Sequence, residues 1–101
     1  MAFVKVVLMK DLEAGHMIGV EAGGKEIVLV NLEGKFYAIG NRCTHMGCML
    51  SDGTLKGRNV TCPCHGSIFD ITTGTAIKGP AKKPELTYQT KIEAEQVLAD
   101  V

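Results

Sequence analysis

All four cysteines and two of the three histidines lie in two six-residue stretches. Residues 43–48 read CTHMGC, and residues 62–67 read CPCHGS. Thiolates and imidazoles are the side chains that most often bind zinc, copper and iron in proteins. Each stretch therefore offers sulfur and nitrogen ligands, and the pattern predicts two loops that hold metal between them.

Two arrangements use one cysteine and one histidine from each stretch. A single tetrahedral zinc could take Cys43, His45, Cys62 and His65, although C-x-H matches poorly the spacing of zinc ribbons and fingers. The other arrangement has two metals, each bound by a like pair with one ligand from each loop. This second arrangement is the ligand set of a Rieske [2Fe-2S] centre, in which two histidines replace two cysteines on one iron.

The two stretches resemble the cluster-binding boxes of the Rieske family. The resemblance covers essentially the whole chain, including GPAKKPEL at residues 79–86, where the family has a proline-bearing loop. It implies a [2Fe-2S] cofactor with Cys43 and Cys62 on one iron and with His45 and His65 on the other. It also implies a Rieske-type ferredoxin, a one-electron carrier whose partners are a reductase and an oxygenase or another redox protein.

Cys48 and Cys64 remain, one in each box. In the high-potential branch of the family the equivalent cysteines form a disulfide that joins the loops, and this sequence is similar to that branch. Disulfides are rare in cytosolic proteins outside hyperthermophiles, which favours two free buried thiols instead. We expect the disulfide, because the two loops would hold both sulfurs together.

Three further residues of this region match family positions near the cluster. The resemblance implies that the Ser67 hydroxyl bonds a bridging sulfide, although Ser67 is also an ordinary turn residue. Phe69 stands where cytochrome bc complex proteins usually have a tyrosine that bonds a cysteine sulfur. We therefore expect a positive reduction potential below theirs. Met46 stands where the family commonly has an aliphatic residue shielding the cluster, and simple loop packing is an equal explanation.

Three lysines, Lys78, Lys82 and Lys83, bracket Pro80. They either present a small basic patch near the cluster to an acidic partner or form a solvated loop. His16 stands alone, and we expect it to be structural or exposed.

The elements that must position these residues have the composition of an all-β protein. Gly23-Gly24 and Glu33-Gly34 each separate two apolar runs and predict hairpins. We expect a single domain over residues 1–101, an antiparallel β-sandwich or barrel with the Rieske fold and a cluster-binding subdomain inserted at about residues 40–79. A short helical turn is predicted at residues 12–15. The expected strands are 3–9, 17–21, 26–32, 36–39, 59–62, 75–77, 86–92 and 97–101.

The composition also excludes several classes of function. Eleven basic and eleven acidic residues give no net charge, so nucleic-acid binding is not expected. The first residues resemble neither a signal peptide nor a membrane span, which predicts a cytoplasmic protein. The sequence leaves the oligomeric state open, and we expect a monomer. No catalytic apparatus is apparent. The alternatives are a soluble subunit of a respiratory bc-like complex, a structural zinc module, and the small subunit of a nitrite reductase.

Overall fold

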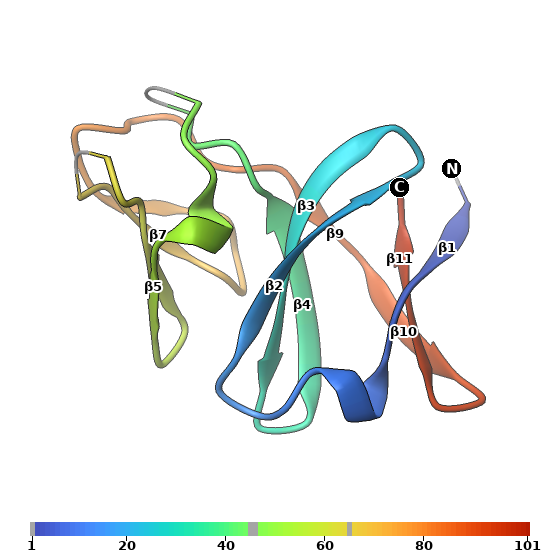
Figure 1. Ribbon diagram of the computed structural model, residues 1–101. Helices are drawn as coiled ribbons and strands as arrows, with labels where there is room; N and C mark the ends of the chain where they lie inside the picture. Colours follow the sequence, from blue (N-terminus) through green and yellow to red (C-terminus); the bar gives the residue numbers. More distant parts are fainter. Residues whose placement is uncertain (1, 45–46, 65) are drawn as a thin grey trace.

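The protein folds as three antiparallel sheets, as predicted for an all-β chain. A computed structural model describes residues 2–44, 47–64 and 66–101. Two of the sheets, β1-β11-β10 and β2-β3-β4-β9, make up a large lobe, and the third, β5-β6-β7-β8, stands at the other end of the molecule (Figure 1). The strands are β1 (Phe3–Leu8), β2 (Met17–Ala22), β3 (Lys25–Leu32), β4 (Lys35–Gly40), β5 (Thr54–Lys56), β6 (Asn59–Thr61), β7 (Ile68–Asp70), β8 (Ala76–Lys78), β9 (Thr87–Tyr88), β10 (Thr90–Glu93) and β11 (Gln96–Asp100).

The central strand β3 is buried on both faces, which explains its unbroken apolar run. Ile27 and Leu29 point into a core that β3 shares with β4 and β11. Val28 and Val30 point the other way, into a second core shared with the small sheet. Because side chains alternate across a strand, one segment joins two cores. The scaffold of the large lobe is therefore continuous with the part of the chain that carries the cysteines.

The two predicted hairpins are confirmed. Gly23 and Gly24 have φ angles of +57° and +78° and connect β2 to β3. Glu33 and Gly34 have φ angles of +53° and +91° and connect β3 to β4. Positive φ at both central residues matches the twist of the flanking strands, and this is why such turns favour glycine.

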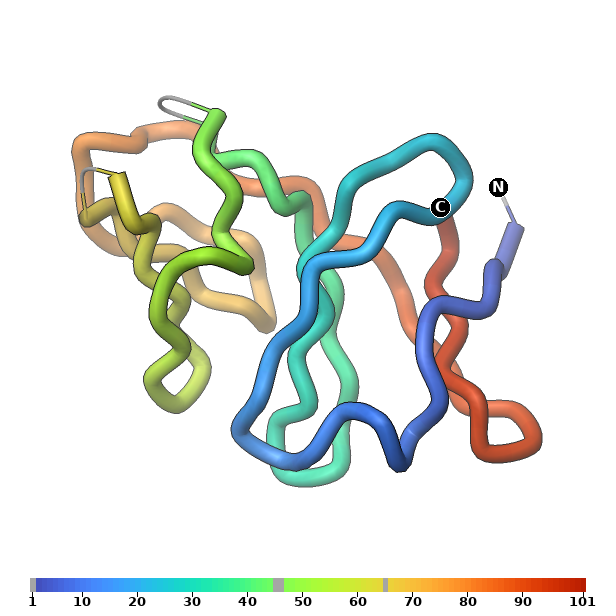
Figure 2. The backbone as a smooth tube through the Cα atoms, in the orientation of Figure 1, coloured from blue at the N-terminus to red at the C-terminus, as the bar shows by residue number. Residues whose placement is uncertain are grey.

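The small lobe, residues 41–86, is inserted between two neighbouring segments of the large lobe. The chain leaves β4 at Gly40 and returns beside it, where the Gly40 N–H donates to the Leu86 carbonyl at 2.9 Å. Figure 2 shows the outgoing and returning segments, in green and orange, running close together at this point. Inside the small lobe, β5 and β7 were not predicted. Both have three residues, as do the predicted strands β6 and β8, and they are defined by their pairing with β6 rather than by a local pattern.

Two other details of the prediction are wrong. The expected strand at residues 86–92 is two strands, because β9 pairs with β4 whereas β10 pairs with β11. The turn expected at residues 12–15 is not helical: a hydrogen-bonded turn forms at Ala14 and Gly15, where the His16 N–H donates to the Glu13 carbonyl at 3.1 Å, and the 3-10 helix lies at Met9–Asp11. Leu12 is buried in the core of the large lobe, and the side chain of Asn31 donates to its carbonyl at 2.8 Å.

Candidate metal centre

The two cysteine-containing loops have the same backbone hydrogen bonds. In the first loop, residues 43–48, the Cys43 N–H donates to the Cys48 carbonyl at 2.7 Å, and the Gly47 N–H donates to the Cys43 carbonyl at 2.8 Å. In the second loop, residues 62–67, the corresponding bonds run from Cys62 to Ser67 at 2.7 Å and from Gly66 to Cys62 at 3.2 Å. Each loop is thus closed by the backbone of its first cysteine.

A glycine in the left-handed region makes each closure possible. Gly47 has φ of +74° and Gly66 has φ of +76°. A Cβ at either position would meet nothing within 4 Å, so the requirement is conformational rather than steric crowding. The glycine lies four residues after the first cysteine in both loops, which explains the similar spacing of the two sequences.

A disulfide between Cys48 and Cys64 joins the loops. It links the last residue of the first loop to the third residue of the second. With these two cysteines bonded to each other, Cys43 and Cys62 are the thiol-bearing side chains left in the chain. Both are 3% exposed and belong to one buried cluster of side chains, so the two loops deliver them to the same place.

A group of three sulfurs includes this disulfide. The Sγ atoms of Cys48, Cys62 and Cys64 lie within 4.8 Å of one another. Because two of the three are covalently paired, they are not thiolates, and this trio is not a set of metal ligands. The closeness instead places the Cys62 sulfur next to the bridge that joins the loops.

Ser67 ends the second loop and is fully buried. Its Oγ accepts a hydrogen bond from the Ala81 N–H at 3.0 Å. A hydroxyl that accepts in this way still carries its own proton, which it can donate to another acceptor. The serine is therefore held by a segment 14 residues away rather than sitting in a solvated turn.

The other residues singled out from the sequence lie around this site. Phe69 is fully buried in the same cluster of side chains as Cys43 and Cys62. Pro80 is exposed and lies next to Ala81, on the segment that returns to the large lobe. His16 is exposed, as expected. The predictions for His45, Met46 and His65 lie outside the described residues.

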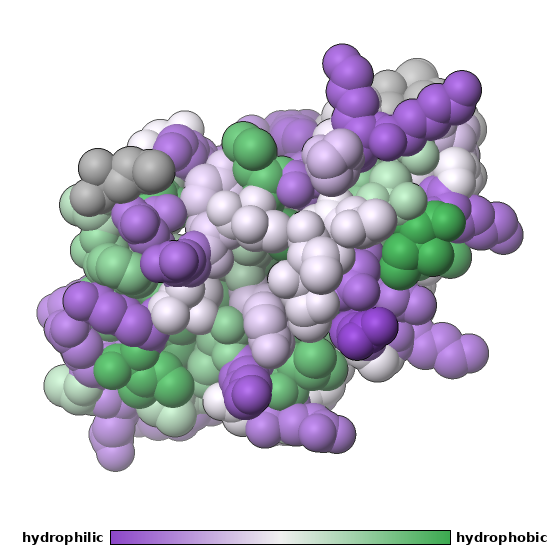
Figure 3. All heavy atoms as spheres, turned by 180° about the vertical axis from the view of Figure 1, so that it is seen from behind, coloured by the Kyte–Doolittle hydropathy of each residue, from purple (hydrophilic) through white to green (hydrophobic). Residues whose placement is uncertain are grey.

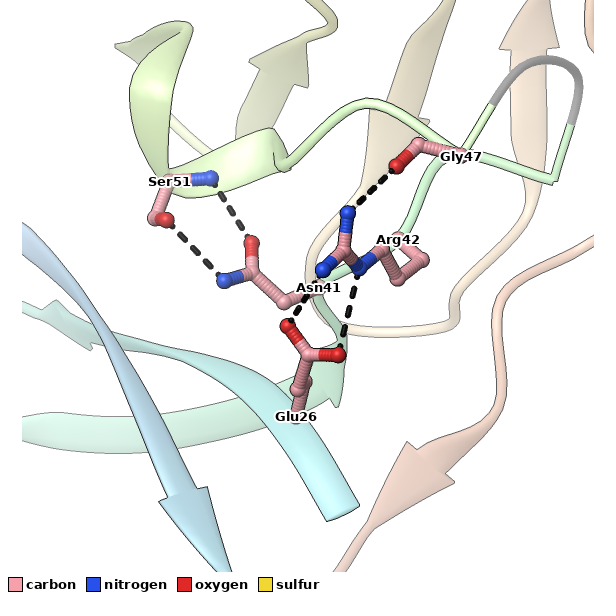
Figure 4. Close-up of polar contacts among 5 residues, drawn as sticks. All are labelled: Glu26, Asn41, Arg42, Gly47 and Ser51. Carbon is pink, nitrogen blue, oxygen red and sulfur yellow. Dashed lines mark hydrogen bonds and ion pairs between the residues drawn. The ribbon is translucent and has the colours of Figure 1, made fainter.

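Arg42 connects the first loop to the large lobe (Figure 4). Its Nε and Nη2 pair with the two carboxylate oxygens of Glu26 on β3 at 3.2 and 3.0 Å, and its Nη1 donates to the Gly47 carbonyl at 3.0 Å. The planar guanidinium can make these bonds in a fixed geometry. One side chain thus fixes the loop relative to the scaffold.

Asn41 makes a second connection beneath the same loop. Its side chain is fully buried, accepts from the Ser51 N–H at 2.8 Å and donates to the Ser51 Oγ at 3.0 Å (Figure 4). Its backbone N–H donates to the Glu26 carbonyl, and its carbonyl accepts from Leu50. All of these polar groups are satisfied, as buried groups require.

Glu85 is a buried acid beside the first loop. It is 7% exposed, and its Oε2 has no hydrogen-bond partner among the described residues. A Cβ on Gly40 would lie 2.6 Å from its Oε1, so the glycine makes room for the carboxyl group. Burial raises the pKa of Glu85 to about 7, against a smaller opposing effect of the Thr44 backbone N–H. The acid therefore carries a proton part of the time at neutral pH.

Asp70, at the end of β7, is the contrasting acid of the small lobe. Burial opposes its ionisation, but bonds from the hydroxyl and N–H of Thr72, the charge of Arg58 and the Thr73 N–H together lower its pKa. Its Oδ2 lies 3.3 Å from the Arg58 Nε. Asp70 is thus an ionised residue that stabilises the turn after β7.

Sequence reasoning missed the roles of Glu26, Asn41, Arg42 and Glu85. Asn41 and Arg42 directly precede Cys43, and this position beside the first loop was the one feature of the sequence that could have indicated their roles. Glu26 lies 16 residues from its partner Arg42, and Glu85 lies 45 residues from Gly40, so no local pattern marks either acid.

The donor set fits an iron–sulfur cluster. Cys43 and Cys62 lie buried in one cluster of side chains, and Cys48 and Cys64 form a disulfide. The buried hydroxyl of Ser67, at the end of the second loop, has a proton that it can donate. Cysteine thiolates hold such clusters, and hydrogen bonds near their sulfurs tune them. The fold and the site together define a small β protein whose paired loops hold a metal cluster.

Residues 2–95 match the family model of the Rieske [2Fe-2S] domain, and the chain belongs to that family. It is 39% identical over 99 residues to the ferredoxin component of the naphthalene 1,2-dioxygenase system of Pseudomonas putida, covering 98% of this chain and 95% of that one. It also superposes on a chain in the complex of reduced oxygenase and oxidized ferredoxin in carbazole 1,9a-dioxygenase, with a TM-score of 0.91, 28% identity and coverage of 96% and 91%.

A third similarity is to the plasma membrane Rieske protein PetC3 of the cyanobacterium Synechocystis PCC 6803. The TM-score is 0.79 and the identity 30%, with 97% of this chain and 99% of that one covered. No helix in the described part of this chain is long and apolar enough to cross a membrane.

Proposed function

We propose that this chain is a one-electron carrier that passes electrons from a reductase to the oxygenase of a dioxygenase system. The observation that carries the proposal is the pair of equivalent loops, which bring two buried cysteines together while a disulfide uses the other two. In this function, Cys43 and Cys62 bind one iron, and His45 and His65 bind the other. The chain acts in the cytoplasm as a monomer.

The cluster, when bound, supplies one-electron redox chemistry at a potential of roughly −150 to +300 mV, because two neutral imidazoles replace two thiolates. The residues of the chain contribute the rest. The Gly47 and Gly66 turns close the loops around the cysteines, and the disulfide keeps the loops at a fixed separation. Burial of Cys43 and Cys62 would keep water from the sulfur ligands, and the Ser67 hydroxyl, which accepts from the Ala81 N–H, would have its own proton to donate to a sulfur of the cluster.

Reconstitution with partner proteins tests this proposal. The cluster-loaded protein is added to the reductase and oxygenase components of a dioxygenase system from which the natural ferredoxin has been omitted, and product formation is measured. We expect turnover that depends on the added protein. His45→Asn should abolish turnover, whereas the matched variant His16→Asn, at the exposed histidine, should retain it. Equal activity of the two variants would contradict the ligand assignment.

A second candidate is the Rieske subunit of a respiratory bc-like complex. The inter-loop disulfide and the similarity to the cyanobacterial plasma membrane protein favour it. The two candidates differ in potential, because a subunit that accepts electrons from a quinol requires a value near the top of the Rieske range. A redox titration therefore separates them, and a value in the upper part of that range would support the second candidate.

A further inference from the structure

The chain has no net charge, but its charges are unevenly distributed. The small lobe contains six of the eleven basic residues and three of the eleven acidic ones, leaving five basic and eight acidic residues in the large lobe. The small lobe thus has an excess of three positive charges at one end of a molecule 40 Å long. One of its three acids, Glu85, is buried and partly protonated near pH 7, and another, Asp70, is paired with Arg58.

Three of the cations lie at the end of β8 and on the segment that connects it to the large lobe. Lys78, Lys82 and Lys83 are exposed. Within residues 2–44, 47–64 and 66–101, none of the three takes part in an ion pair, whereas Arg42 and Arg58 each do. We call residues 78–83, which carry these three lysines, the lysine segment.

The lysine segment is attached to both loops of the metal centre. Lys78 pairs with Ile68 in the β7–β8 register, and the Ala81 N–H donates to the Ser67 Oγ at 3.0 Å, which fixes the segment to the second loop. The Thr44 Oγ1 donates to the Lys83 carbonyl at 2.8 Å, which fixes it to the first. In Figure 1 this orange segment runs beside both loops.

A solvated loop would not need these attachments. Here the backbone on each side of Lys82 is bonded to a different loop, so the lysines are held beside the metal centre. Figure 3 shows long hydrophilic side chains projecting from the end of the molecule that carries the small lobe, at the upper right of the view. Charges placed in this way create a local positive field without a net charge on the protein.

We propose that the lysine segment is a docking surface for an acidic redox partner. The inference rests on the proposed function, since it assumes that electrons enter or leave at the loops beside the segment. An acidic patch on the partner would complement the segment and be repelled by the acidic large lobe. The partner would therefore bind at the end of the carrier that contains the two loops of the metal centre, and salt would weaken the binding.

Two small oxidants of opposite charge test the field without a partner protein. The cluster-loaded, reduced protein is mixed in a stopped-flow instrument with hexacyanoferrate(III), a trivalent anion, or with tris(phenanthroline)cobalt(III), a trivalent cation. The readout is the ratio of the two rate constants, because a change in driving force affects both rates alike. For a lysine about 10 Å from the reacting position, Coulomb's law with salt screening gives about a fourfold effect on each rate at 0.01 M ionic strength and less than twofold at 0.15 M.

The variant Lys82→Gln with Lys83→Gln should lower this ratio at least tenfold at 0.01 M ionic strength, and the effect should shrink at 0.15 M. The matched control is Lys10→Gln with Lys35→Gln, at two exposed lysines of the large lobe that take part in no ion pair in the described residues. It changes the net charge equally and should leave the ratio within about twofold. Equal ratios in the two variants would overturn the docking surface while leaving the carrier function intact. Failure to obtain any reducible protein would instead overturn the proposed function.

A binding measurement tests the kind of partner. Fluorescently labelled poly-L-glutamate should bind the wild-type protein at low salt and bind the control variant equally, with several-fold weaker binding to the Lys82 and Lys83 variant. Tighter binding of a labelled DNA duplex than of poly-L-glutamate at the same salt concentration would contradict an acidic protein as the partner.

Discussion

The two loops of the metal centre share a backbone but differ in what holds them. The first loop is supported by polar side chains, with Arg42 and Glu26 on one side and the acid Glu85 on another. The second loop connects the paired strands β6 and β7, and its last residue, Ser67, accepts a hydrogen bond from the Ala81 N–H. The comparison teaches that the two loops share a backbone shape and a cross-link but differ at their sixth residue, which is the cross-linking Cys48 in the first loop and the hydrogen-bonded Ser67 in the second.

The largest expected effect comes from removing the link between the loops. Cys48→Ala with Cys64→Ala deletes a bridge across 16 residues and should lower the free energy of unfolding by about 3 kcal/mol, because the unfolded chain regains the freedom of that closed loop. Urea unfolding of the cluster-free protein measures this. Reduction of the wild type with dithiothreitol should give a similar loss, and an unchanged midpoint in both experiments would show that the loops hold their positions without the bridge.

Ser67→Ala tests the tuning residue of the second loop. A hydrogen bond to a charged acceptor contributes about 1.5–3 kcal/mol, so its loss should lower the one-electron potential by roughly 65–130 mV. Thr44→Val is the control, since it removes a hydroxyl of the first loop that is already bonded to the Lys83 carbonyl. Redox titration of both variants checks the assignment. Equal shifts of the potential in Ser67→Ala and Thr44→Val would contradict the role assigned to Ser67.

Glu85→Gln tests the buried acid beside the first loop. The pKa is about 7 in the folded protein and 4.5 for an ordinary glutamate, so the unfolded chain ionises first as the pH rises. The contribution of Glu85 to the free energy of unfolding is therefore fully present below about pH 4.5 and is lost as the pH rises to about 7. The variant should be more stable than wild type by about 2 kcal/mol at pH 8 and unchanged at pH 4. Glu21→Gln, at an exposed acid, is the control and should show neither effect.

Phe69→Tyr adds a hydroxyl in the cluster of side chains that contains Cys43 and Cys62. If the hydroxyl reaches a cysteine sulfur, the potential should rise by less than the loss caused by Ser67→Ala, since a thiolate sulfur is a weaker acceptor. A redox titration that shows no rise would mean that the ring points away from the sulfurs. Phe69→Leu is the control for altered packing without a donor.

The smallest effect is expected at the support of the first loop. Arg42 and Glu26 have side chains that are 56% and 38% exposed, and surface ion pairs contribute less than about 1 kcal/mol. Arg42→Lys should lower the free energy of unfolding by a few tenths of about 1 kcal/mol. Lysine has no planar guanidinium with which to bond both the carboxylate and the Gly47 carbonyl. Urea unfolding at low and high salt measures the difference. A loss of unfolding free energy as large as that from removing the disulfide would contradict a minor role for the Arg42 contacts.

The sequence allowed the fold class, the hairpins and the disulfide partners to be predicted, because these depend on glycine positions and on a family pattern. The short strands β5 and β7 were missed although β6 and β8, of the same length, were predicted, because β5 and β7 arise from pairing with β6 rather than from a local pattern. The break between β9 and β10 arises from pairing with two different sheets, which is a tertiary effect. Glu85 escaped notice for the same reason, because its burial depends on Gly40, which is distant in the sequence.

The ligand set is the central claim, and a redox titration followed by electron paramagnetic resonance across pH tests it most directly. Two irons and two acid-labile sulfides per chain are expected, with a potential of roughly −150 to +300 mV that falls at high pH as the iron-bound imidazoles lose protons. A protein that binds zinc without sulfide, or a potential near −400 mV that does not change with pH, would contradict the account.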